Sequence, residues 1–226
     1  MPGEVLVFDM DGVLVDVGES YRECIQQTVK NFTGREVSRA AIQDLKNQGG
    51  WNNDWELSHR IIGDLGVTVD YAEVVDYFQR IFFGDDDREG LVLREQWVAR
   101  PGLLERLGWR FQLAIFTGRT RDEVKVTLER FGSSLRFDPV ITVEDVARPK
   151  PAPDGLLRIA ELAPGRKLWY VGDTPDDARS ARAAGVAFIG IAAPSNPRHR
   201  ELALLLKQEN ARAVLEDINQ LEGVLE

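Results

Sequence analysis

The amino-acid sequence predicts an α/β protein in which a doubly wound parallel sheet carries a helical domain inserted after its first strand. From Pro101 onward, short apolar runs alternate with helical patterns, which is typical of a parallel sheet covered by helices on both faces. Residues 17–98 look wholly helical, and this segment is too long for a simple crossover between two strands. We therefore expect an α/β core formed by residues 1–16 and 99–226, and a helical cap formed by residues 17–98.

The first strand is expected at Val5–Phe8, a short apolar run that leads into Asp9, Asp11 and Gly12. Residues i and i+2 of an extended segment point to the same side, so the two carboxylates should project together. Two close carboxylates repel each other, and a hard divalent cation such as Mg²⁺, which prefers oxygen ligands, would relieve that repulsion. The alternative for these residues alone is a pair of solvated aspartates in a turn.

Four helices are expected in the inserted region, because apolar residues recur there at helical spacing over Glu19–Phe32, Ser38–Leu45, Trp55–Leu65 and Asp70–Phe83. Ser38 and Asp70 are the expected N-caps of the second and fourth helices. The acidic run Asp85–Asp87 should form an exposed loop or a helix start. Lys46 is expected to be a solvated helix lysine.

Trp51 and Asn52 belong to an unusual stretch of glycine, amide and indole side chains, Gly49–Trp55. Indole rings and amides could stack on an organic leaving group and hydrogen-bond it, so this stretch is a candidate for substrate binding. The alternative is a helix start, with Asn53 or Asp54 as the N-cap and Trp51 packing against the first turn. Both interpretations can hold together.

The rest of the chain should alternate between helices and strands. Helices are expected at Pro101–Leu107, Asp122–Phe131, Pro153–Ala163, Pro175–Ala184, near 198–208 and at the C-terminus. Strands are expected at Gln112–Phe116, Pro139–Val143, Lys167–Val171, Val186–Ile191 and Ala213–Leu215. Connections between the parallel strands should be right-handed, and ligands of such sheets bind beyond the carboxyl ends of the strands.

Polar residues follow the later strands at the positions where ligands would bind. Thr117 follows the second strand, Lys150 lies in a proline-rich loop, and Asp173 follows a later strand with Asp177 four residues on. Each has an ordinary alternative: a helix-capping hydroxyl, a surface charge, or carboxylates lining the first turn of a helix. Their joint occurrence after successive strands favours one shared site with the carboxylates of the first strand.

Four segments of the chain resemble the motifs of the haloacid dehalogenase-like hydrolases, a large group of mostly magnesium-dependent phosphatases. These segments are Asp9–Leu14, Phe116–Arg119, Lys150–Asp154 and Val171–Asp177. The resemblance spans essentially the whole chain, although the inserted helices match only in character. It implies a Rossmann-like core with a small helical cap.

The resemblance implies a role for each matching residue. Asp9 would be the nucleophile that forms an aspartyl-phosphate, and Asp11 would donate and later accept a proton. Thr117 would hydrogen-bond a phosphate oxygen, and Lys150 would neutralise both the phosphate and the nucleophile. Gly118 and Arg119, which complete the second motif, are further candidates for phosphate binding. Trp51 and Asn52 of the cap are candidates for substrate binding.

A magnesium site is also implied by the resemblance. Mg²⁺ would bind the Asp9 side chain, the Asp11 backbone carbonyl and Asp173, while Asp177 would support the site from nearby. Asp176 competes with Asp177 by adjacency, and the family spacing selects Asp177.

Several other activities remain open. Val13 stands where many phosphatases of this family have threonine, and valine also occurs in the sugar-phosphate mutase branch, so a phosphosugar mutase is the alternative enzyme. Dehalogenation is less favoured because that chemistry lacks the second carboxylate, here Asp11. Phosphonate cleavage would need a cap lysine that forms a Schiff base, for which Lys46 is the candidate. A non-catalytic phospho-accepting module would also have an aspartate, a threonine and a lysine at strand ends, but it lacks an Asp11-type acid and an inserted cap.

The amino-acid composition limits which binding partners and which cellular compartment we expect. The formal net charge of −9 disfavours nucleic acid, whose phosphates need a basic surface. The single cysteine, Cys24, excludes an internal disulfide and fits a reducing cytoplasm, and no apolar run approaches membrane-spanning length. We therefore expect a cytoplasmic monomer or homodimer that binds Mg²⁺ and a small phosphorylated metabolite, with no nucleic acid and no membrane partner.

Overall fold

The computed structural model describes residues 3–132 and 134–225, so the expected ends of the core at residues 1–2 and 226 lie outside the described residues. The chain divides into two compact units. The α/β unit comprises the chain up to Val15 and from Trp97 on, and the helical unit comprises Asp16–Gln96. Within the described ranges, no helix combines the length and the apolar character that a membrane crossing requires.

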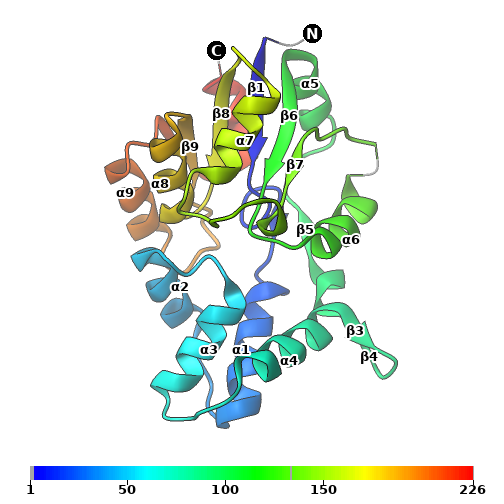
Figure 1. Cartoon of the computed structure of the whole chain (residues 1–226), viewed down its shortest axis with the longest axis vertical. Helices are drawn as coiled ribbons and strands as arrows, with labels where there is room; N and C mark the ends of the chain where they lie inside the picture. The colour runs from blue at the N-terminus through cyan, green and yellow to red at the C-terminus, as the bar shows by residue number, and fades with distance from the viewer. Residues whose placement is uncertain (1–2, 133, 226) are drawn as a thin grey trace. The chain divides into compact units, whose positions relative to one another are not determined.

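A six-stranded parallel sheet forms the centre of the α/β unit (Figure 1). Its strands in chain order are β1 (Glu4–Phe8), β6 (Phe111–Phe116), β7 (Val140–Ile141), β8 (Lys167–Gly172), β9 (Ala187–Ile191) and β10 (Ala213–Leu215). The order across the sheet is β10-β9-β8-β1-β6-β7, and neighbouring strands pair in parallel. The predicted parallel α/β fold is confirmed.

The central strand β1 aligns the ends of its two neighbours. Phe8 pairs with Ile115 of β6 and with Val171 of β8, so the three strands end at nearly the same level. All four residues from Val5 to Phe8 are fully buried, which explains why this strand reads as a continuous apolar run. Each such side chain stabilises the fold by roughly 1.5–3 kcal/mol relative to exposure, so the burial of this strand stabilises the sheet that carries the strand ends.

Helices alternate with these strands along the chain. They are α5 (Leu103–Arg110), α6 (Arg121–Phe131), α7 (Asp154–Leu162), α8 (Pro175–Ala184) and α9 (His199–Gln208), with 3-10 helices η2 (Val143–Asp145) and η3 (Ile218–Gly223). Apolar residues of α7, α8 and α9 pack with alternate residues of β1, β6 and β8 in one core cluster. Thr120 and Thr174 begin α6 and α8 as N-caps, each in a reciprocal capping box with an acidic residue.

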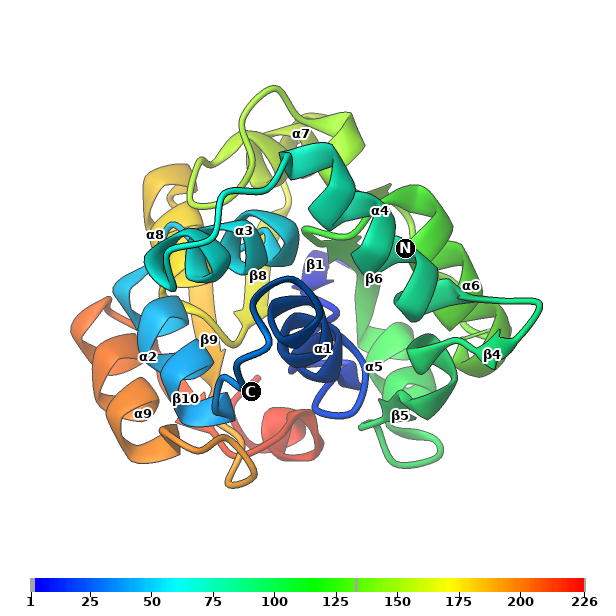
Figure 2. The same ribbon diagram turned by 90° about the horizontal axis from the view of Figure 1, so that it is seen from below.

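The helical unit is built from α1 (Tyr21–Thr33), α2 (Arg39–Gln48), α3 (Asp54–Asp64) and α4 (Tyr71–Phe83), with the 3-10 helix η1 (Leu91–Arg94). Helices α1, α3 and α4 contact one another, and Figure 2 views α1 nearly along its axis with the other two beside it. Ser38 and Asp70 are the N-caps of α2 and α4, as predicted. Where the chain passes between the units, β2 (Val15–Asp16) and β5 (Gln96–Trp97) form a two-stranded sheet.

Two expectations about secondary structure were wrong, and the expected last helix is a 3-10 helix. The region after the first strand is not wholly helical, because β3 (Gly84–Asp85) and β4 (Arg88–Glu89) form a hairpin. In its turn Asp85 Oδ1 accepts a hydrogen bond from the backbone N–H of Asp87 at 3.1 Å, so the acidic run is an exposed turn. Strand β7 is shorter than predicted because Thr142 begins η2, and the last helix is the 3-10 helix η3.

Candidate active site

Polar residues of the α/β unit gather beyond the carboxyl ends of three adjacent strands. Asp9 directly follows β1, Thr117 follows β6, and Asp173 follows β8. Lys150 comes from the loop before α7, and Asp177 lies in the first turn of α8. This is the edge at which the sequence placed them, because in parallel sheets loops at the carboxyl ends converge.

The centre of the site is a buried lysine between two aspartates. Lys150 Nζ lies 2.9 Å from Asp9 Oδ1 and 2.8 Å from Asp177 Oδ1. The three side chains are 1%, 6% and 0% exposed, respectively, so the interpretation of Lys150 as a surface charge is wrong. The ammonium also lies over the rings of Phe116 and Tyr170, at 4.9 and 5.4 Å from their centroids.

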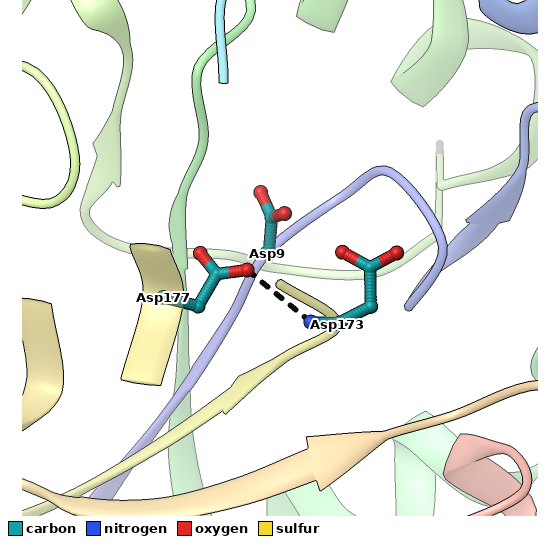
Figure 3. Close-up of side chains that lie close together, drawn as sticks. All are labelled: Asp9, Asp173 and Asp177. Carbon is teal, nitrogen blue, oxygen red and sulfur yellow. Dashed lines mark hydrogen bonds between the residues drawn. The ribbon is translucent and has the colours of Figure 1, made fainter. Parts of the chain in front are cut away.

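In addition to the contact with Lys150, four hydrogen bonds hold the Asp177 side chain. Its Oδ2 accepts from the backbone N–H groups of Asp173 and Thr174 at 3.2 and 3.0 Å, and from the Thr174 hydroxyl at 2.6 Å; Figure 3 shows the link to Asp173. Its Oδ1 accepts from the Tyr170 hydroxyl at 2.7 Å. Burial acts to raise the pKa of Asp177, but Lys150 and these donors outweigh burial and hold the pKa below its usual range.

Asp9 is in the opposite electrostatic situation. Burial raises its pKa to about 7; Lys150 opposes this, while the charges of Asp177 and Asp11 reinforce it. Two buried carboxylates therefore share one lysine, and the site carries more negative than positive charge. A carboxylate with a raised pKa is poorly ionised near neutral pH unless a further positive charge is supplied.

A divalent cation fits this donor set. Among the described residues, ligand oxygens of Asp9, Asp173 and Asp177 lie within 4.8 Å of one another (Figure 3). Carboxylate oxygens are the ligands that Mg²⁺ prefers, and the surplus negative charge around Asp9 is what a cation would balance. Gly12 keeps the space beside Asp173 open, since a Cβ there would lie 2.0 Å from Asp173 Oδ2.

Asp11 and Arg119 form an ion pair that sequence reasoning missed. Arg119 Nε and Nη2 lie 2.7 and 2.6 Å from Asp11 Oδ1. The guanidinium, 1% exposed, also donates through Nη1 to the Thr127 hydroxyl at 2.6 Å. Arg119 was predicted as a phosphate ligand, and the structure gives its guanidinium these protein partners. No local sequence pattern indicates this pair, because Asp11 and Arg119 lie 108 residues apart in the chain.

The remaining residues of the second motif lie in the turn after β6. Thr117 is 1% exposed, and its hydroxyl accepts a hydrogen bond from the backbone N–H of Arg119 at 3.2 Å. Thr120, not Thr117, caps α6, so the helix-capping alternative for Thr117 is wrong. Gly118 lies between Thr117 and Arg119 in the same turn. The Thr117 hydroxyl is thus held at the strand end by local backbone geometry.

Trp51 and Asn52 lie in the loop between α2 and α3 of the helical unit. Asn53 caps α3 by accepting from the backbone N–H groups of residues 55 and 56, so it, and not Asp54, is the N-cap. The expectation of a solvated Lys46 was wrong. Lys46 is 8% exposed, and its Nζ lies 2.5 Å from Asp54 Oδ1, because the loop turns the acidic first residue of α3 back onto α2.

Comparison with known proteins gives the family. A model of the haloacid dehalogenase-like hydrolases matches residues 4–185. An imidazoleglycerol-phosphate dehydratase of Phytophthora nicotianae is 34% identical over 202 residues, which cover 85% of this chain and 44% of that protein, so this chain spans less than half of that relative. A phosphoglycolate phosphatase of Escherichia coli is 33% identical over 204 residues, which cover 82% of this chain and 80% of that protein.

A solved structure supports the fold over nearly the whole chain. The haloacid dehalogenase-like protein of unknown function from Agrobacterium tumefaciens superimposes with a TM-score of 0.73 at 19% identity, covering 98% of this chain and 97% of that one. The chain belongs to the haloacid dehalogenase-like hydrolase family. The resemblance predicted from the four motifs is confirmed, and the protein is an enzyme of the hydrolase class.

Proposed function

We propose that this enzyme is a Mg²⁺-dependent phosphatase that hydrolyses a small phosphorylated metabolite through an aspartyl-phosphate on Asp9. The observation that carries the proposal is the buried contact of Lys150 with Asp9 and Asp177 at the carboxyl edge of the sheet. This contact puts a buried ammonium beside the proposed nucleophile, where it can bind a phosphoryl oxygen once Mg²⁺ balances the surplus negative charge of the carboxylates. The name of the E. coli relative, a phosphoglycolate phosphatase, supports a substrate of this class.

In the first step, a carboxylate oxygen of Asp9 attacks phosphorus and the bond from phosphorus to the leaving oxygen breaks. Asp11 gives its proton to that oxygen, so the product leaves as a neutral alcohol. Lys150 and the Thr117 hydroxyl bind the phosphoryl oxygens, on which negative charge must be stabilised. Lys150 also holds the nucleophile in place through its 2.9 Å contact.

In the second step, water attacks the phosphorus of the aspartyl-phosphate. Asp11, now ionised, accepts the proton of that water, and the bond between phosphorus and Asp9 breaks to release inorganic phosphate. The side chains of Asp9 and Asp173 and the Asp11 carbonyl would hold Mg²⁺, with Asp177 orienting this set. When bound, the ion supplies positive charge that offsets the charge of the transferring group.

We also propose that residues 17–98 act as a cap, in which Trp51 and Asn52 contact the substrate. If so, Trp51→Ala should change the ranking of substrates by kcat/KM rather than lower all of them equally. An equal loss for every substrate would contradict this role. Trp109→Ala, at an indole of α5 that is 79% exposed and outside the proposed site, is the control.

The test of the proposed function is phosphate release from a panel of phosphorylated metabolites, with and without Mg²⁺. Release should require Mg²⁺, be lost in Asp9→Asn, and persist in the control Asp122→Asn, an exposed carboxylate of α6. Phosphate release that survives Asp9→Asn would overturn the assignment of Asp9 as the nucleophile. Isomerisation of a sugar phosphate without net phosphate release would instead favour the mutase.

A further inference from the structure

A guanidinium in the interior of the α/β unit contacts only part of the carboxylate of Asp11. Arg119 reaches Asp11 Oδ1 through both Nε and Nη2, at 2.7 and 2.6 Å. Both contacts therefore converge on one oxygen. The Asp11 side chain is 30% exposed, whereas Arg119 is 1% exposed. Because both contacts with Arg119 engage Oδ1, Oδ2 is the oxygen that could exchange a proton with a substrate.

Arg119 is itself fixed by α6. Its Nη1 donates to the hydroxyl of Thr127, which is fully buried, at 2.6 Å. Burial raises the pKa of the nearby carboxyl of Glu123, and the charge of Arg119 acts to lower it. Glu123 Oε2 in turn accepts hydrogen bonds from the backbone N–H and the hydroxyl of Thr120, at 2.8 and 3.0 Å. The first two turns of α6 thus hold the guanidinium in one orientation, as a supporting shell must if it is to orient a reactive group.

We propose that Arg119 is a positioning residue that holds Oδ1 of Asp11, so that Oδ2 delivers the proton to the leaving oxygen and recovers one from water. The proposal rests on the proposed function, in which Asp11 is the acid and the base. Arginine suits this task because its guanidinium stays charged throughout and has no acceptor. It can hold the carboxyl through both steps without exchanging a proton with it.

The test compares two leaving groups in the parent, Arg119→Met and Arg119→Lys. An alkyl phosphate needs a proton on its leaving oxygen, whereas p-nitrophenyl phosphate releases a stable phenolate without one. Because kcat/KM reports the steps up to the first bond cleavage, Arg119→Met should lower kcat/KM for the alkyl phosphate by about 10²-fold or more, the scale of general acid catalysis. For p-nitrophenyl phosphate the loss should stay below about tenfold, well short of that scale.

Two further variants keep the test independent of folding. Arg119→Lys retains a charge with poorer geometry and should recover part of the alkyl phosphate activity. Thr127→Val removes the hydroxyl that anchors Arg119 and should give a smaller loss with the same selectivity. Asp11→Asn should show the full selective pattern. Thermal unfolding of each variant separates loss of fold from loss of proton transfer.

Equal losses for both leaving groups in Arg119→Met and Thr127→Val would overturn the positioning role and leave a structural ion pair. In that case the parent still releases phosphate, and the proposed function stands. If the parent releases neither leaving group with Mg²⁺, the proposed function fails and this inference fails with it.

Discussion

Lys150 Nζ and Asp9 Oδ1 lie 2.9 Å apart in a part of the α/β unit where both side chains are almost fully buried. The same ammonium lies 2.8 Å from Asp177, and the two carboxylates raise the pKa of Lys150 although burial acts to lower it. The lysine is therefore charged in the folded protein. In these contacts, the positive charge of Lys150 balances the negative charge of Asp9. The same ion pair therefore affects both the stability of the fold and the chemistry of the site.

Removing this charge should destabilise the protein. Lys150→Met leaves two buried carboxylates without their cation, and breaking a buried ion pair in this way typically costs about 3–5 kcal/mol in the free energy of unfolding. The loss should be smaller at lower pH, where Asp9 binds a proton. Urea unfolding at several pH values measures it. Lys125→Met, at a lysine that is 69% exposed, is the control and should change little; equal stability of Lys150→Met and the parent would contradict the prediction.

The pKa of Asp9 predicts how the stability of the metal-free protein depends on pH. Burial raises that pKa to about 7 from 3.8, so between these values the folded state binds more protons than the unfolded state. The contribution of Asp9 to the free energy of unfolding should therefore fall as pH rises from about 4 to about 7. Asp9→Asn cannot titrate and should lack this component. Unfolding curves measured with a chelator present would refute the assignment if both proteins had the same pH profile.

Magnesium affinity should depend on Asp173. This carboxylate belongs to the cluster of Asp9, Asp173 and Asp177, whereas its neighbour Asp176 lies 3.6 Å from Arg179. Asp173→Asn should weaken Mg²⁺ binding by at least about tenfold, the lower end of the effect expected when a ligand set is altered. Calorimetric titration with Mg²⁺ measures the change. Asp176→Asn should bind Mg²⁺ nearly as the parent does, and equal affinities of Asp173→Asn and the parent would count against the site.

Gly12 should not tolerate a side chain. Its φ of +71° is strained for other residues, and an added Cβ would lie 2.0 Å from Asp173 Oδ2. Gly12→Ala should therefore displace Asp173 and weaken Mg²⁺ binding, beyond a loss of stability of about 1–2 kcal/mol from the left-handed backbone conformation. Gly34→Ala is the control, because its φ is +69° but no atom lies within 4 Å of an added Cβ. Equal Mg²⁺ affinity in the two variants would show that the space beside Asp173 is not needed.

The sheet and the strand-end residues could be predicted from the sequence because parallel strands are buried on both faces and their carboxyl ends meet. That argument predicts Asp9, Thr117 and Asp173 at one edge of the sheet, and they follow β1, β6 and β8 there. The same argument does not predict which groups the charged side chains contact. Whether Arg119 faces solvent, phosphate or Asp11 depends on side-chain packing beneath α6, which no local pattern encodes.

The same limit explains the errors in the helical unit. Lys46 and Asp54 are eight residues apart on different helices, and only the path of the intervening loop brings them to 2.5 Å. The expected run of helices is interrupted because Gly84 and Asp85 pair with Glu89 and Arg88 in a hairpin, whose turn is the exposed loop expected for the acidic run. In both cases the structure depends on contacts between residues whose individual helix and turn propensities do not predict them.

The most direct test of the central claim is to locate the phosphoryl group on the protein. Asp11→Asn, incubated with Mg²⁺ and p-nitrophenyl phosphate, should complete the first step and stall before hydrolysis, because the base for water is missing. Acid quenching followed by peptide mass spectrometry should find one phosphoryl group on Asp9, and none when Asp9→Asn is added to the same variant. A phosphoryl group on another residue, or release of nitrophenolate with no phosphorylated protein, would contradict the account.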